Sequence, residues 1–183
     1  MRPNLSARIV AEFLGTAFLV AAVVGSGIMA ERLSGGNAAL ALLANTLATG
    51  AALVALILTF GPISGAHLNP VVSVADALEG GLSAMETVVY VLAQTSGGLA
   101  GTLAAHAMFG LPLFSLSHHA RSGSAQLFSE FVATFGLLCD LGMLPFPLER
   151  CPVRSRSLHY RRVLVYILHI VRQSCGDDCA VAQ

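Results

Sequence analysis

The chain alternates between long apolar runs and short polar connections. The first three runs are each roughly 23 residues or longer, enough for a helix to cross a hydrocarbon core of about 30 Å. The polar connections contain glycine pairs such as Gly35-Gly36, which are typical of a tight turn between helices. The pattern therefore predicts an all-α membrane protein with spans at about 8–30, 38–60, 83–109 and 127–144.

A short apolar segment between the second and third runs cannot span a membrane. It follows the polar stretch 64–71 and begins at Asn69-Pro70. Asparagine is a good N-cap, and proline suits the first helical position because its missing N–H would find no partner there. We therefore predict a re-entrant half-helix over about 69–78, ending where Gly80-Gly81 and the neighbouring acids return to water. Such a helix points free N–H groups and its positive dipole end into the membrane.

Composition supports a membrane location and argues against other classes of protein. Hydrophobic residues make up 55% and charged residues 11% of the chain, with a mean hydropathy of +0.75, whereas soluble domains carry about 25% charged residues. The net charge is zero and no basic stripe is present, so we expect a lipid bilayer and no nucleic acid as partner. The cysteines lack metal-site or CxxC spacing, and no nucleophile lies beside a base, so we expect no metal, no cofactor and no enzyme.

Two polar side chains interrupt the apolar runs. Glu12 either reaches the membrane surface from near the helix end or faces the bundle and accepts hydrogen bonds from buried backbone N–H groups. We favour the second interpretation, in which Glu12 is a structural support. Gln94 lies beside Gly97, Gly98 and Gly101, and at such small-residue surfaces we expect it to bridge helices rather than to bind a substrate.

Part of the first run recurs in the fourth. Residues 11–16 (AEFLGT) match residues 129–134 (SEFVAT), so that Glu130 corresponds to Glu12. Three crossings separate the two copies, and an odd number gives them opposite orientations, which is the signature of an inverted repeat. Two arginines precede the first run and six follow the fourth. The positive-inside rule then predicts a cytoplasmic N-terminus.

Residues 63–72 (ISGAHLNPVV) closely resemble the first pore motif of the aquaporin, or major intrinsic protein, family. The segments AEFLGT, AQTSGG (93–98) and SEFVATFG (129–136) are similar to others of that family, and the resemblance covers residues 5–138. It implies an aquaporin-like right-handed bundle of six helices and two half-helices, assembled as a homotetramer in the cell (inner) membrane. It also implies a channel that passes water and small neutral solutes such as glycerol.

The resemblance assigns roles around the half-helix. Asn69 and Pro70 would form the constriction, where the Asn69 oxygen caps the helix and its NH₂ group donates to a passing solute. Backbone carbonyls between residues 64 and 68 would form a ladder of acceptors. Thr49, twenty residues before Asn69, would line the outer filter. Because it is smaller than the aromatic residue typical of water-selective members, it favours glycerol or similar solutes.

The pore-lining candidates are therefore Ser64, Gly65, Ala66, His67, Leu68, Asn69, Pro70 and Val71. His67 has two interpretations that the sequence leaves open, a pore-lining side chain and a hydrogen-bonded histidine of the core. Val71 departs from the alanine that the family usually has at this position, and its branched side chain would tighten or tilt the start of the half-helix.

The resemblance stops after Leu138. No second Asn-Pro motif follows, and the apolar run 163–171 is too short to cross a membrane. Reverse translation of residues 163–181 with the reading frame moved by one nucleotide permits Y-W-F-T-S-S-T-S-F-A-N-P-A-V-T-I-A-R, which resembles the family's second pore motif. We therefore interpret residues 139–183 as a frameshifted tail, in which Cys175 and Cys179 have no selected chemistry.

Three hypotheses for function follow. The first is a passive channel. The second is a non-conducting truncated remnant of such a channel, because a half-helix without its opposing partner leaves backbone donors unmatched at the midplane. The third is an ion-coupled secondary transporter, which is less favoured because the runs lack a bundle-facing Asp or Arg pair near the midplane.

Overall fold

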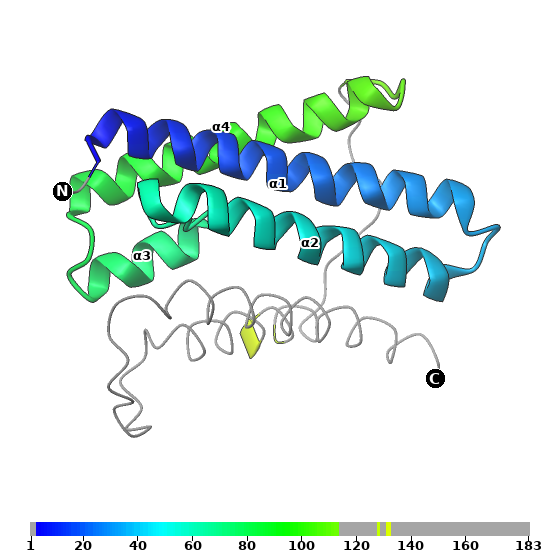
Figure 1. Ribbon diagram of the computed structural model, residues 1–183, viewed down its shortest axis with the longest axis horizontal. Coiled ribbons are helices and arrows are strands. Elements are labelled where there is room, and N and C mark those ends of the chain that lie inside the picture. The colour runs from blue at the N-terminus through cyan, green and yellow to red at the C-terminus, as the bar shows by residue number, and fades with distance from the viewer. Residues whose placement is uncertain (1–2, 114–127, 129–130, 133–183) are drawn as a thin grey trace. The chain divides into compact units, whose positions relative to one another are not determined.

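The structure is a computed structural model that describes residues 3–113, 128 and 131–132. The unit formed by residues 1–113 contains helices α1 (Leu5–Leu33), α2 (Ala38–Ser64), α3 (Pro70–Leu78) and α4 (Ala84–Met108) (Figure 1). The described part is all-α, as the sequence predicts, and α1, α2 and α4 are each long and apolar enough to span a membrane. The predicted span at 127–144, Glu130 and the tail at 139–183 lie outside the described residues, although Phe128, Phe131 and Val132 are helical.

Each long helix begins at a side chain that caps its first turn. The Oδ1 atom of Asn4 accepts a hydrogen bond from the Ala7 amide at 2.8 Å, and Asn37 caps α2 in the same way. Ser83 and Glu86 form a reciprocal capping box at the start of α4. These side chains satisfy backbone N–H groups that have no partner within the helix, so the sequence itself sets where the spans begin.

Helix α2 continues beyond the predicted end at residue 60. Pro62 lies inside its last turn, where the missing N–H removes a single backbone hydrogen bond without stopping the helix. The helix ends at Ser64 because Gly65 takes a left-handed conformation, with φ of 95°, and its N–H closes the helix on the Gly61 carbonyl at 3.0 Å. The non-helical stretch of the pore motif is therefore Gly65–Asn69, and Ser64 belongs to α2.

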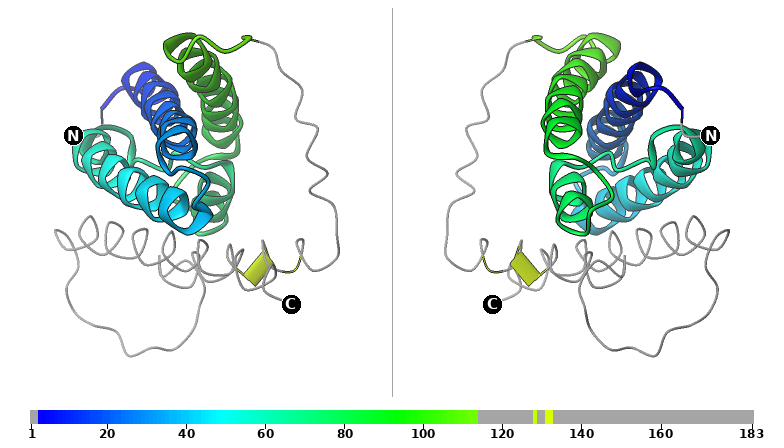
Figure 2. Two further views of the ribbon diagram at one scale, coloured as in Figure 1. Left: turned by 90° about the vertical axis from the view of Figure 1, so that its right-hand side faces the viewer. Right: turned by 90° about the vertical axis from the view of Figure 1, so that its left-hand side faces the viewer.

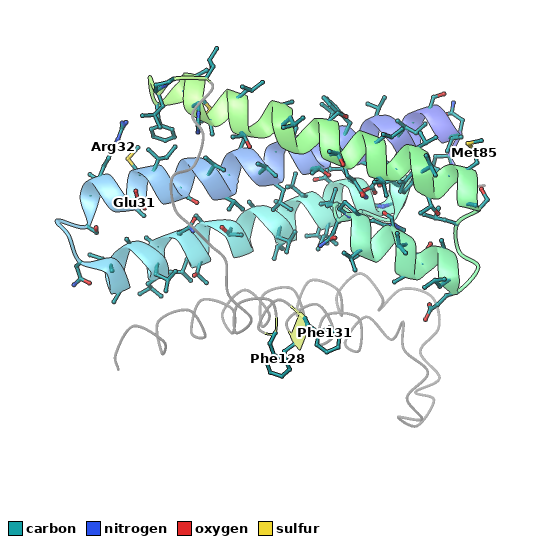
Figure 3. The ribbon with its side chains drawn as sticks, turned by 180° about the vertical axis from the view of Figure 1, so that it is seen from behind. Glu31, Arg32, Met85, Phe128 and Phe131 are labelled. Carbon is teal, nitrogen blue, oxygen red and sulfur yellow. The ribbon has the colours of Figure 1, made fainter. Side chains whose placement is uncertain are left out.

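Helices α1 and α4 run side by side in the same direction. At their starts, Nη1 of Arg8 lies 2.6 Å from Oε1 of Glu86. At their ends, Nη2 of Arg32 donates to the Phe109 carbonyl at 3.2 Å. Figure 3 shows the same polarity, with Arg32 at one end of the bundle and Met85, next to the start of α4, at the other. In the end-on views of Figure 2 the three long helices lie side by side.

Helix α2 runs antiparallel to α1, and α3 leads from inside the bundle to the end where α1 begins (Figure 1). The hydroxyl of Ser26, late in α1, donates to Asn45, early in α2, at 2.7 Å, whereas Ser64 at the end of α2 donates to Glu12. Glu12 lies about 10 Å along the axis from the first residue of α1, at 1.5 Å per residue. Helix α3 therefore starts inside the bundle and has the course of a half-helix.

Two glycines bring α4 into backbone contact with α1. A Cβ atom at Gly97 would collide with the Phe13 carbonyl oxygen, and one at Gly101 would collide with the Ala17 carbonyl oxygen. Small residues at such a surface allow close helix packing in a membrane, where lipid supplies no hydrophobic driving force between helices. This close approach places the polar side chains of the two helices within hydrogen-bonding distance.

We expect Gly97→Ala to destabilise the bundle and the neighbouring Gly98→Ala to leave it unchanged. A methyl group at Gly97 must push the helices apart, at a cost of about 1–3 kcal/mol. A Cβ at Gly98 would meet only Val20 Cγ2, at 3.9 Å. Thermal unfolding of both variants in detergent measures the difference, and equal midpoints would contradict the close contact.

Candidate functional site

The site is built around the loop between α2 and α3, residues 65–69. Three of its residues have left-handed backbone conformations: Gly65 (φ 95°), Ala66 (φ 48°) and Leu68 (φ 50°). Glycine adopts this conformation without strain, but alanine and leucine do so only where surrounding contacts hold them. The conformations of Ala66 and Leu68 therefore depend on contacts with the surrounding helices.

Glu12 of α1 holds the loop through both of its carboxylate oxygens. Oε1 accepts hydrogen bonds from the Ser64 hydroxyl at 2.5 Å and from the His67 amide at 3.0 Å. Oε2 accepts from the Leu68 amide at 2.8 Å and from Nε2 of Gln94 at 2.8 Å. The side chain is fully buried. A buried carboxylate is stable only when donors surround it, and here four donors do so.

Gln94 and Ser73 extend this network to α4 and α3. The Gln94 amide nitrogen donates to Glu12 and also to the Ser73 hydroxyl, at 2.9 Å. The amide orientation follows from the carboxylate, because an amide oxygen facing Glu12 would place two acceptors together. Ser73 Oγ also lies 3.3 Å from the Asn69 carbonyl. The start of the half-helix is thereby joined to α1 and α4.

The ring of His67 is buried among these groups. It is 4% exposed, its Nδ1 atom lies 3.1 Å from Ser73 Oγ, and it packs edge-on against Tyr90 with ring centroids 5.6 Å apart. Its Nε2 atom faces the Asp76 carboxylate at 3.9 Å. In the described residues, the imidazole thus has the surroundings of a core histidine, which is one of the two interpretations that the sequence leaves open.

Asn69 is the N-cap of the half-helix, and the two polar atoms of its side chain differ in their partners. Its Oδ1 atom accepts from the Val71 amide at 2.9 Å, as an N-cap should, and its Nδ2 donates to no other described residue. Asn69 is partly exposed, Pro70 is exposed and Val71 is 43% exposed. The carbonyl oxygens of Ala66 and Leu68 likewise accept no hydrogen bond from the described residues. The loop therefore carries a side-chain donor and two backbone acceptors that no described residue uses.

Thr49 does not lie beside this loop. It is a partly exposed residue of α2, fifteen positions before Ser64, or about 22 Å along the helix axis at 1.5 Å per residue. Among the described residues, no group of three His, Cys, Asp or Glu side chains is placed to hold a metal ion.

Three buried side chains around the loop escape prediction from the sequence: Ser73, Tyr90, which packs on His67, and Arg8, which donates to the Tyr90 hydroxyl. Ser73 is fully buried and Tyr90 has no exposed surface. The signal that could reveal Ser73 is its position four residues after Asn69, one helical turn on. Tyr90 lies four residues before Gln94, on the same face of α4.

Three long apolar helices, packed with a half-helix that begins inside the bundle, define a multi-pass membrane protein of the kind that builds polar paths from half-helices. Residues 2–143 match the family described as Major intrinsic protein. The chain belongs to this family, whose members are membrane channels and not enzymes.

Similar proteins support the assignment. The chain is 54% identical over 138 residues to the aquaglyceroporin AqpS of Rhizobium meliloti (strain 1021), covering 75% of this chain and 59% of that protein. It is 35% identical over 127 residues to the probable aquaporin NIP7-1 of Arabidopsis thaliana, covering 69% and 45%. It is 35% identical over 144 residues to aquaporin A of Dictyostelium discoideum, covering 74% and 50%. The chain thus spans about half the length of the relatives it matches.

We expect Glu12→Gln to destabilise the loop and the bundle, by about 1–3 kcal/mol for the buried donors that lose their acceptor. A glutamine NH₂ group would face donors at either oxygen position. Glu31→Gln is the matched control, because Glu31 is exposed at the far end of α1. The free energy of unfolding in detergent measures both changes, and an equal effect of the two substitutions would show that the network contributes nothing.

Proposed function

We propose that the chain forms part of a passive channel for water and small neutral solutes such as glycerol. The observation that carries this proposal is the geometry of Asn69, whose oxygen caps α3 while its amide nitrogen has no partner among the described residues. A donor held at a half-helix start inside a membrane bundle suits the hydroxyl oxygen of a passing solute. The name of the similar Rhizobium protein, an aquaglyceroporin, supports the same solute class.

The loop supplies the complementary acceptors. The Ala66 and Leu68 carbonyls accept no hydrogen bond from the described residues, and a solute that lost its hydration shell would find acceptors there. The positive dipole end of α3 opposes the entry of cations. Glu12 offers no free oxygen to a cation there, because its carboxylate is buried and already accepts four hydrogen bonds.

Two side chains are proposed to set the width of the passage. Thr49 would line the outer filter, where its small side chain leaves room for a three-carbon polyol. Val71 is 43% exposed at the first turn of the half-helix. Its branched side chain would narrow the constriction relative to alanine.

Thr49→Phe is expected to abolish glycerol permeation while water flux persists, because an aromatic ring occupies the width that glycerol needs. Thr59→Phe is the matched control, since Thr59 is an exposed threonine of the same helix on another face. Stopped-flow light scattering of reconstituted vesicles measures both fluxes, using the protein with its reading frame restored near the codon for Cys139. Equal glycerol uptake by both variants would place the filter elsewhere.

The second candidate, a non-conducting remnant, is favoured by one observation: the match to the family ends at residue 143 and does not include the last part of the chain. The 183-residue chain is therefore the second arm of the same measurement. Rates equal to those of empty vesicles support the remnant, whereas faster swelling than empty vesicles contradicts it.

We further propose an inner-membrane homotetramer with a cytoplasmic N-terminus, which places the α1–α2 turn outside and the α3–α4 turn inside. Glu31 and Glu79 are exposed at these opposite ends. In a chain whose native cysteines are replaced by serine, a membrane-impermeant thiol reagent should label Glu31→Cys in intact cells. It should label Glu79→Cys only after permeabilisation, and labelling of both in intact cells would contradict the topology.

A further inference from the structure

A chain of polar side chains connects the start of α4 to the carbonyl group that precedes the pore loop. Tyr90 Oη donates to the Ser64 carbonyl at 3.1 Å and accepts from Nε of Arg8 at 2.8 Å. Arg8 Nη1 bonds to Glu86 Oε1 at 2.6 Å. The other oxygen of Glu86 accepts from the amide and hydroxyl of Ser83, both at 2.9 Å.

The direction of these hydrogen bonds is fixed by chemistry. A guanidinium group has only donors, so Arg8 can do nothing but donate to Tyr90 Oη. The tyrosine hydroxyl proton must then point elsewhere, and the acceptor available to it is the Ser64 carbonyl. Arg8 therefore orients the Tyr90 hydroxyl, and the hydroxyl holds the last residue of α2.

Both the hydroxyl and the carbonyl of Ser64 are consequently held, each by a different helix. Glu12 of α1 accepts from its hydroxyl, and Tyr90 of α4 donates to its carbonyl. Because Ser64 immediately precedes the left-handed residues Gly65 and Ala66, any rotation of its peptide group changes the direction of the loop that follows. The burial of Arg8, which is 8% exposed, and of Tyr90, which is fully buried, keeps water from replacing either bond.

We propose that Arg8 and Tyr90 are positioning residues for the pore loop. They fix the Ser64 carbonyl against α4. The Ser64 carbonyl is then not available to a solute, and the orientation of the loop carbonyls that follow it is set. The role of this positioning in solute passage rests on the proposed channel function. The positioning of the loop itself does not require that the chain conducts.

The test uses the full 183-residue chain in lipid nanodiscs and hydrogen–deuterium exchange of peptides that cover residues 64–69. The four amides of residues 65–68 all donate hydrogen bonds within this region. Tyr90→Phe keeps the ring and removes only the hydroxyl. We expect it to raise exchange of this loop about fivefold, the effect of one net hydrogen bond, with no change in peptides covering residues 97–105. Thr95→Ala is the control, since it removes an exposed hydroxyl of the same helix.

A double-mutant cycle separates positioning from simple packing. Arg8→Lys keeps the charge opposite Glu86 but lacks the fixed fork of donors that serves Glu86 and Tyr90 together. It should raise loop exchange in the wild-type background and add nothing in the Tyr90→Phe background, because Arg8 acts through the Tyr90 hydroxyl. Additive effects, unchanged loop exchange, or a uniform rise across α1, α2 and α4 with a lower melting temperature would each overturn the proposal. A loop that responds as expected in a 183-residue chain that conducts neither water nor glycerol would leave the positioning intact and support the non-conducting remnant.

Discussion

The carboxylate of Glu12 accepts four hydrogen bonds from three segments of the chain, and the rest of the described structure depends on them. The loop it holds contains left-handed residues other than glycine, and a membrane offers no water to satisfy its amides. Removing the acceptor would leave buried donors unpaired, each at a cost comparable to a large fraction of a protein's net stability. The buried Glu12 carboxylate, although costly to bury, thus stabilises the left-handed conformations of the loop.

The glycines of α4 make this network possible. Gln94 can reach Glu12 only because Gly97 and Gly101 let the backbones of α1 and α4 touch. A bulkier surface would separate the two helices and place the amide out of range. The small residues of α4 and the buried Glu12–Gln94 pair therefore both depend on the same close approach of α1 and α4.

Much of the fold follows from local signals in the sequence. Apolar runs predict the spans, and Asn69-Pro70 predicts the half-helix because capping is a local interaction. The end of α2 is less predictable, since Pro62 resembles a stop signal and the actual stop is the left-handed Gly65.

The identity of the site's partners depends on tertiary contacts and could not be predicted in this way. Glu12 must have donors, but those donors lie 52 to 82 residues away in the sequence. Arg8 and Tyr90 resemble residues of a membrane surface, where both types are common, and only packing shows them to be buried. The surroundings of the His67 ring likewise follow from α4 and not from its own motif.

The separation of these contacts along the chain also orders events during synthesis. Helix α1 leaves the ribosome before the loop does, so Glu12 is already present when the amides of His67 and Leu68 enter the membrane. Tyr90 and Gln94 follow about twenty residues later and join a loop that has its first acceptor. Glu12 can therefore accept hydrogen bonds from the loop amides before α4 has been synthesised. Helix α4 then adds the contacts of Tyr90 and Gln94 to a loop that α1 already holds.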